Sequence, residues 1–291
     1  MTNRVHVERY PTARAFLAAT KAALLLAEVE NNLMLGIAGE VAERDAAPGA
    51  AEYFAAVLAE QKIMGCAFRS VSDKIGITRI DTTEALLALA VDVGSACPDA
   101  SSVGGPEPTV ATFAELLAAS TGRHAEPRMA QRIHELRSVV PPQRAVRGRL
   151  RPAGEGEIGS LTPWVEDMLS VMGDQRHAGE IARERILGGH LFVWDDDGPV
   201  SMAAWTGKTP NGVRVNFVYT PPELRGRGYA SACVAALSQR LLDQGNAYCC
   251  LYTDLANPTS NAIYRRIGYH PVCDAGLYQL REAGPSASSN R

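Results

Sequence analysis

The two halves of the chain repeat one order of hydrophobic and polar patterns. Stretches with apolar residues at helical spacing alternate with short apolar or alternating stretches that are typical of strands. In the first half the predicted helices are 12–28, 30–42, 84–93 and 109–120, and the predicted strands are 52–59, 62–69, 74–80, 101–103 and 128–140. In the second half the predicted helices are 157–171, 177–187, 229–244 and 259–267, and the predicted strands are 147–151, 190–194, 200–206, 213–220, 247–253 and 272–280. Each half therefore reads helix, helix, three antiparallel strands, helix, strand, helix, strand, and the second half has an additional leading strand.

This repeated order predicts a mixed α/β fold with two similar domains in tandem. We expect a first domain at 1–145 and a second at 146–281, because Pro141 and Pro142 end the long strand before the repeat. The last residues, 282–291, are small and polar, and we expect them to be disordered.

Composition and charge exclude several classes of function. The 291 residues are 46% hydrophobic with a net charge of −3, and a pI of about 6.1 gives no basic surface for nucleic acid. The six cysteines show no metal-ligand spacing, so we expect no metal. The longest apolar helix, around 13–27, is interrupted by Lys21 and is too short to span a membrane. With no recognisable signal peptide, the sequence predicts a cytoplasmic, reduced protein.

A glycine-containing turn joins a predicted strand to a predicted helix at Leu224-Arg225-Gly226-Arg227-Gly228-Tyr229-Ala230-Ser231. A helix N-terminus has unpaired N–H donors and a partial positive charge, which suit a phosphate or pyrophosphate. The turn is not a P-loop, because no lysine follows the glycines. It is not a dinucleotide fingerprint either, because Ser231 stands in place of the third glycine and the preceding strands form hairpins.

The pattern that fits is R-x-x-G-x-A, formed by Arg225, Gly228 and Ala230, which resembles the acyl-CoA loop of the GNAT N-acetyltransferase superfamily. A second stretch, from Thr253 to Tyr269, resembles the GNAT pattern N-x-x-A-x-x-x-Y-x-x-x-G-[FY], with serine in place of the alanine. The resemblance covers about 150–280 and includes a bacterial subfamily of predicted acetyltransferases. It implies the GNAT fold and acetyl-CoA (coenzyme A) as the acyl donor.

The resemblance also implies which residues bind acetyl-CoA. Strands 213–220 and 247–253 would splay apart around the pantetheine arm, and loop N–H groups would hold the pyrophosphate. Carried over by position, the binding residues are Val218, Tyr219, Thr220, Arg225, Gly226, Arg227, Gly228, Tyr229, Ala230, Asn257 and Tyr264. Asn257 precedes Pro258, so it can also be read as a helix cap, and the two roles are compatible.

Two residues are predicted to be catalytic. Tyr264 would hydrogen-bond or protonate the leaving thiolate, although its helical spacing also fits a core tyrosine. Asn216 stands where some GNAT enzymes carry a glutamate base, and an amide can orient a water but cannot take a proton. The base would therefore be a water chain or another residue (Asp254, Tyr219 and Glu166 are the alternatives), unless the amine arrives neutral.

We therefore expect an acetyl-CoA-dependent N-acetyltransferase that acts on a small-molecule or peptide amine by direct attack in a ternary complex. The alternatives are a non-catalytic acyl-CoA sensor and, from another class, a nucleotide-dependent oxidoreductase. In the first half, residues 81–84 replace the loop with acidic residues and no glycine, so that domain should not bind the nucleotide. It would shape the acceptor pocket or mediate a homodimer. No nucleic-acid or membrane partner is expected.

Overall fold

The computed structural model describes residues 5–44, 52–69, 73–141, 145–172 and 176–282. These residues divide into two compact units that exchange segments along the chain. Unit 1 contains the described residues up to Ile133, together with Asp254–Ala256 and those from Val272 onward. Unit 2 contains the described residues of 134–253 and 257–271.

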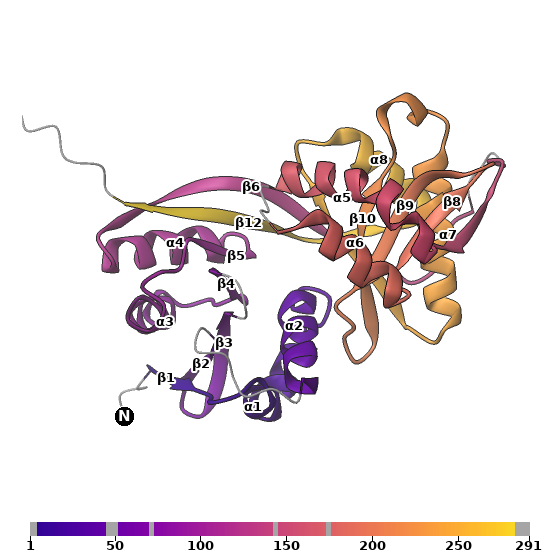
Figure 1. Cartoon of the computed structure of the whole chain (residues 1–291). Coiled ribbons are helices and arrows are strands. Elements are labelled where there is room, and N and C mark those ends of the chain that lie inside the picture. Colours follow the sequence, from indigo (N-terminus) through magenta and orange to yellow (C-terminus); the bar gives the residue numbers. More distant parts are fainter. Residues whose placement is uncertain (1–4, 45–51, 70–72, 142–144, 173–175, 283–291) are drawn as a thin grey trace, which may run out of the picture. The chain divides into compact units, whose positions relative to one another are not determined.

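Unit 1 is a sheet with helices on both faces. Its strands pair in the order β1-β2-β3-β4-β5-β12-β6, and β4 and β5 are parallel. Along the chain the elements are β1 (Val5–Arg9), α1 (Ala13–Leu25), α2 (Asn32–Glu43), β2 (Tyr53–Ala59), β3 (Lys62–Arg69), β4 (Lys74–Ile77), α3 (Thr83–Ala96), β5 (Ser102–Pro106), α4 (Thr109–Ser120), β6 (Arg123–Leu136) and finally β12 (His270–Glu282) (Figure 1).

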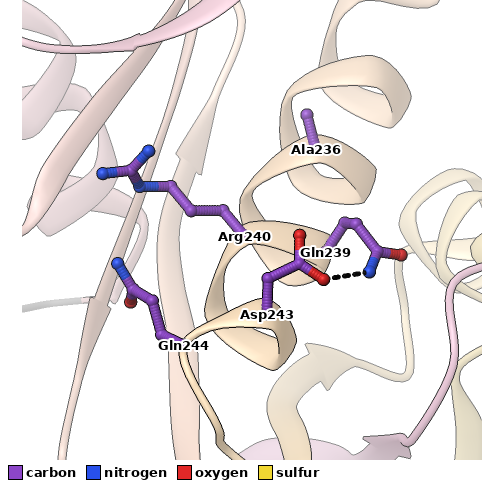
Figure 2. A pocket seen from close by; sticks show the side chains of 5 residues that line it. All are labelled: Ala236, Gln239, Arg240, Asp243 and Gln244. Carbon is purple, nitrogen blue, oxygen red and sulfur yellow. Dashed lines mark hydrogen bonds between the residues drawn. The ribbon is translucent and has the colours of Figure 1, made fainter.

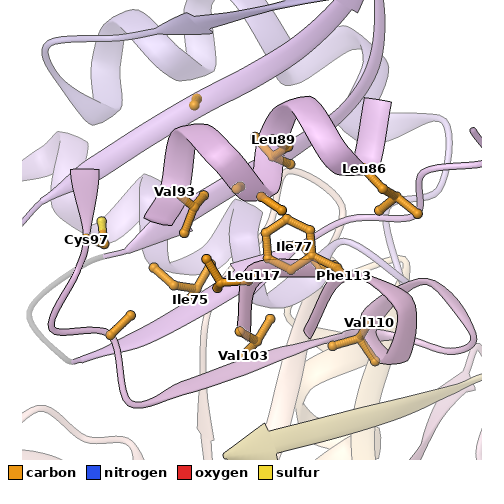
Figure 3. Packing of buried hydrophobic residues seen from close by; sticks show 14 of the residues in the cluster. Ile75, Ile77, Leu86, Leu89, Val93, Cys97, Val103, Val110, Phe113 and Leu117 are labelled. Carbon is orange, nitrogen blue, oxygen red and sulfur yellow. The ribbon is translucent and has the colours of Figure 1, made fainter. Parts of the chain in front are cut away.

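Alternation along β2 places its side chains in two separate cores. Tyr53, Ala55 and Val57 pack in one cluster with α3 and α4, while the alternate residues of β2 pack with α1 and α2. Figure 3 shows Leu89 and Val93 of α3 close to Phe113 and Leu117 of α4 in the first of these cores. Both faces of the sheet are therefore covered, as the predicted helix pairs require.

Unit 2 repeats this arrangement. Its strands pair in the order β6-β11-β10-β9-β8-β7, with β10 and β11 parallel and the pairs from β10 to β7 antiparallel. The elements are β7 (Arg149–Pro152), α5 (Ile158–Met172), α6 (Ala178–Leu187), β8 (Leu191–Asp195), β9 (Pro199–Thr206), β10 (Gly212–Tyr219), α7 (Tyr229–Asp243), β11 (Tyr248–Asp254) and α8 (Pro258–Ile267). One core packs α7 and α8 against the sheet, and another packs α5 and α6 against it.

The sequence prediction of a mixed α/β fold with two similar halves is confirmed, with two differences. The first half also has a leading strand, β1, which pairs with β2. The expected strand 272–280 lies in unit 1, where β12 pairs with β5. The units are thus not continuous segments divided at 145/146, since Leu136 of β6 packs in a core of unit 2 and Leu280 of β12 packs in a core of unit 1. The expected disordered tail lies outside the described residues, apart from Glu282.

Candidate functional site

The inward-facing side chains of strand β10 switch from one face of the sheet to the other near the end of the strand. Its register against β9 shifts between Asn216 and Tyr219, so that two residues oppose one and form a β-bulge. Phe217, within the bulge, has a φ of 49°, which is rare for a bulky side chain. Val213 and Val215 pack in the α7/α8 core, whereas Phe217 and Tyr219 pack in the α5/α6 core. Strain of this kind persists only where surrounding packing holds it, and it is frequent at functional sites.

The two parallel strands of unit 2 pair over only part of their length. The described pairing of β10 with β11 runs from Gly212 to Arg214 and from Tyr248 to Cys250. The bulged end of β10 and the second half of β11 lie beyond this pairing.

The glycine loop leads directly into α7. Gly226 and Gly228 have φ values of 78° and 87°, a region that favours glycine. Gly228 is the N-cap residue of α7, and no described side chain caps this helix. The helices α1, α3 and α8 each have such a cap, from Thr12, Thr82 and Asn257. The helices α2, α4 and α6 also lack a side-chain cap, but only α7 among these uncapped helices follows the glycine loop with its two arginines, so its first-turn N–H donors are suited to an external anion.

The two loop arginines are exposed and held by backbone oxygens. The Nε of Arg225 donates to the Thr220 carbonyl at 3.0 Å, and its guanidinium lies 5.9 Å from the centre of the Tyr219 ring. An Arg227 guanidinium nitrogen donates to the Glu223 carbonyl at 3.3 Å. Two positive charges thus flank an uncapped helix N-terminus, and the loop residues fit a pyrophosphate.

Thr220 and Tyr219 are fixed from both sides of the strand end. The Ser201 hydroxyl donates to the Tyr219 carbonyl at 3.0 Å and lies 2.9 Å from the Thr220 hydroxyl. The Tyr219 hydroxyl donates to Asp167 of α5, and this hydrogen bond raises the pKa of Tyr219. A phenol with a raised pKa keeps its proton at neutral pH and cannot take another, which disfavours Tyr219 as the general base.

Tyr264 lies in α8 and is 8% exposed. Burial raises the pKa of its hydroxyl, so the phenol keeps its proton at neutral pH and can act as a donor. It packs edge-on to Tyr269, with ring centres 5.9 Å apart, in the same cluster that Val218 packs against. The structure thus brings Tyr264 and Val218 to the same face of β10.

Asn257 and Asn216 have different surroundings. The Asn257 side chain accepts from the Ser260 N–H at 3.0 Å, so the predicted helix cap is confirmed. The Asn216 amide donates to the Thr206 hydroxyl at 2.8 Å. Its Oδ1 is buried without a hydrogen-bond partner among the described residues. Asn216 follows Val215 by one residue, so it faces the α5/α6 side of the strand, away from the Tyr264 cluster.

The remaining base alternatives are both exposed. Glu166 lies on the outer part of α5. Asp254 accepts from the Ala256 N–H at 2.8 Å and so stabilises the turn after β11.

Sequence reasoning missed the side chains that hold the site in place. Asp167 binds Tyr219, Ser201 binds Thr220, and Asp196 accepts from the Tyr229 hydroxyl at 2.7 Å. Asp196 lies in the turn between β8 and β9, where the Gly198 N–H donates to Asp195 at 2.9 Å. The local sequence of this turn does not indicate the hydrogen bond between Asp196 and Tyr229 of the glycine loop.

A surface hollow of about 470 Å³ lies at the other end of α7, away from the glycine loop. It is lined by Ala236, Gln239, Arg240, Asp243 and Gln244. Figure 2 shows Gln239 bonded to Asp243 and turned away from Arg240. All five lining residues belong to the second half of α7 and its C-cap, at the opposite end of the helix from the glycine loop. The hollow therefore adds no residue to the candidate site. Across the described chain, no helix has the length and apolarity that crossing a membrane demands.

Comparisons with known proteins agree with this geometry. Residues 194–275 match the model of the FR47-like protein family, and these residues include β10, the glycine loop, α7 and α8. No curated protein is significantly similar in sequence.

Solved structures share the fold over nearly the whole chain. A tandem GNAT protein from the clavulanic acid biosynthesis pathway is 14% identical, with a TM-score of 0.53, over 97% of this chain and 100% of that one. A GCN5-related N-acetyltransferase from Sphaerobacter thermophilus is 16% identical, with a TM-score of 0.56, over 97% of each chain. A Drosophila protein is 11% identical, with a TM-score of 0.66, over 95% of this chain and 98% of that one. The chain therefore has the fold of the GNAT superfamily, and its residues 194–275 match the FR47-like family model.

Proposed function

We propose that unit 2 binds acetyl-CoA and transfers its acetyl group to an amine by direct attack in a ternary complex. The observation that carries this proposal is the uncapped N-terminus of α7, which follows two left-handed glycines at the end of a bulged strand. The N–H groups of 225–230 would hold the pyrophosphate. Backbone groups of Val218 and Thr220 would bind the pantetheine arm from one side, and Asn257 from the other.

Bound acetyl-CoA would supply an activated acetyl thioester. The protein would position the amine, donate a hydrogen bond to the developing oxyanion from the backbone near Val218, and place the Tyr264 hydroxyl near the leaving sulfur. Asn216 would orient a water or the amine through its unpaired Oδ1. The acceptor is a small-molecule or peptide amine.

A second candidate is a non-catalytic acyl-CoA sensor. It is favoured by the neutral amide of Asn216 and by the state of Asp167, the carboxylate described beside the bulge, which already accepts from the Tyr219 hydroxyl. Release of free thiol from acetyl-CoA with a panel of amines separates the two candidates. Turnover with any amine supports the enzyme, whereas tight binding without turnover supports the sensor.

The phosphate-binding role of the loop is tested by Gly226→Ala. Gly226 has a φ of 78° and no neighbour within 4 Å of an added Cβ. The methyl group imposes a left-handed strain of about 1–2 kcal/mol and pushes the loop toward other conformations. We expect calorimetry to show acetyl-CoA affinity reduced at least tenfold, which is about 1.4 kcal/mol.

The matched control is Gly245→Ala. Gly245 has a φ of 93° and likewise no neighbour within 4 Å of an added Cβ, but it follows the opposite end of α7. Both variants should lose similar stability, and only Gly226→Ala should lose affinity. Equal affinity in the two folded variants would overturn the assignment of the loop.

A further inference from the structure

Tyr229 links the glycine loop to a distant hairpin turn. It is the first residue of α7 and directly follows Gly228. Its hydroxyl donates to Asp196 Oδ2 at 2.7 Å, and Asp196 lies in the turn between β8 and β9. The Asp196 side chain is only 12% exposed, so this hydrogen bond to a charged group is largely shielded from water.

Arg147 completes the contact from a third segment. Its Nε lies 3.0 Å from Asp196 Oδ1, and it also pairs with Asp197. The Arg147 carbonyl accepts from the Trp194 indole at 2.9 Å, which fixes the segment on β8. The neighbouring Val146 is so close to the loop that its Cγ2 would lie 3.1 Å from a Cβ placed on Gly228.

The charges of Asp196 and Arg147, together with the Tyr229 phenol, are compatible with an anion-binding site beside them. A carboxylate next to a phosphate loop would repel the ligand if it were unpaired. Asp196 Oδ2 instead accepts from the Tyr229 phenol, and Oδ1 lies 3.0 Å from the Arg147 Nε in an ion pair that offsets the carboxylate charge. The hydrogen bond to Asp196 raises the pKa of Tyr229, so the phenol remains a donor at neutral and mildly alkaline pH.

The loop needs such a restraint because of its own composition. Two glycines in five residues give the free loop many conformations. If the ligand had to order the loop, the loss of conformational entropy would weaken binding. Fixing Tyr229 sets the first turn of α7 and the direction in which its N–H groups point. Preorganisation of this kind raises affinity without adding a contact to the ligand.

We propose that Tyr229 and Asp196 form a latch that holds residues 225–229 in their phosphate-binding geometry, with Arg147 neutralising Asp196. The latch rests on the proposed function, since it acts on the pyrophosphate loop. Tyr229 is thus a positioning residue through its hydroxyl, in addition to the expected role of its backbone.

The test is Tyr229→Phe, which removes the hydroxyl and keeps the ring. We expect acetyl-CoA affinity measured by calorimetry to fall about five- to tenfold, which is less than the full effect of a hydrogen bond to a charged group, because only the part that orders the loop counts toward binding. Amides 225–231 of the protein without ligand should exchange hydrogen faster. Affinity for S-acetylpantetheine, which has no pyrophosphate, should not change.

The matched control is Tyr278→Phe. The Tyr278 hydroxyl donates to Glu107 at 2.9 Å in unit 1, so the same phenol-to-carboxylate bond is removed away from the loop. This variant should leave acetyl-CoA affinity and exchange at 225–231 unchanged. Asp196→Ala should reproduce the effect of Tyr229→Phe, and the double variant should be no weaker than either single one.

Three outcomes would overturn the latch: unchanged exchange at 225–231 in Tyr229→Phe, wild-type affinity in that variant, or an equal loss of affinity for S-acetylpantetheine. A wild-type protein that binds no acetyl-CoA overturns the proposed function instead. The exchange measurement on the ligand-free protein still decides whether the hydroxyl restrains the loop in that case.

Discussion

Tyr264 is the side chain whose hydroxyl most directly separates catalysis from binding. It is nearly buried, its raised pKa keeps it protonated, and its ring packs against Tyr269. Such a phenol can donate to a leaving thiolate, but a core tyrosine would have the same surroundings. Only the loss of the hydroxyl tells the two roles apart.

We expect Tyr264→Phe to lower kcat about a hundredfold or more, because general-acid catalysis is typically worth 10²–10⁴-fold. The KM for acetyl-CoA should barely change, since the hydroxyl would act mainly in the transition state. Thiol release under single-turnover conditions measures the chemical step.

The control for this prediction is Tyr269→Phe. The Tyr269 hydroxyl lies 2.8 Å from that of Ser238, so its removal should lower stability and leave the chemical step intact. If Tyr264→Phe retains full turnover, Tyr264 is a core residue and water is the acid.

For individual residues, the sequence predicted the backbone features of the site better than the distant side chains that bind to it. The glycines and the Asn257 cap depend on local backbone geometry, which neighbouring residues determine. Asp167 and Asp196 are 52 and 33 residues away in sequence from the tyrosines they bind. Their contacts depend on how strands pair and which way helices face, and no local pattern reports that.

Among the elements, the two equivalent strand-to-helix connections differ in what their helix offers a ligand. The Thr82 hydroxyl accepts from the Ala85 N–H and so caps α3, whereas no described side chain caps α7. Ile80 is buried and fills the space beside Gly65, where an added Cβ would lie 2.3 Å from its Cγ1. An added Cβ on Gly105 of β5 would lie only 2.8 Å from the Ile77 carbonyl of β4, so these strands remain close together.

These contacts predict one acetyl-CoA per chain. In unit 1 the Thr82 hydroxyl already occupies the Ala85 N–H, Glu84 adds a negative charge to the first turn of α3, and the adjacent strands remain close together, so the site suits neither a pyrophosphate nor a pantetheine arm. Calorimetric titration should give a single set of sites with a stoichiometry of one. Two equivalent sites would contradict this difference between α3 and α7.

Element boundaries were predicted well where the pattern was long and periodic, as for α4, expected at 109–120 and observed at Thr109–Ser120. The short edge strand β1 was missed, because three of its five residues are exposed polar residues, namely His6, Glu8 and Arg9. The bulge in β10 was missed for a different reason. Val213, Val215, Phe217 and Tyr219 alternate perfectly in sequence and predict one buried face, yet the bulge divides them between two cores.

For the whole molecule, the exchange of segments means that sequence position does not indicate which unit a residue stabilises. Leu280 is close to the end of the described chain and packs with α3 and α4 of unit 1. Its N–H donates to the Ser101 carbonyl at 2.7 Å in the same unit. Ile267, thirteen residues earlier, packs in the α7/α8 core of unit 2.

We therefore expect Leu280→Ala to destabilise unit 1 by about 2–5 kcal/mol, the usual effect of a buried leucine-to-alanine change. Hydrogen exchange should show lost protection in α3 and α4. The control Ile267→Ala should instead lower protection in α7 and α8. Loss of protection in α7 and α8 for Leu280→Ala would show that β12 supports the unit in which its sequence begins.

The exchanged strand β12 also reverses the order in which the chain can finish folding during synthesis. A ribosome releases the N-terminal half first, and domains generally fold as they emerge. In unit 1, however, β5 pairs with β4 on one side and with β12 on the other. The β12 partner is not available until the residues from Val272 onward have been made. Unit 2 needs nothing beyond Pro271. The half that is translated first is therefore completed last, and until then the nascent chain carries an open sheet edge at β5 of the kind that invites aggregation.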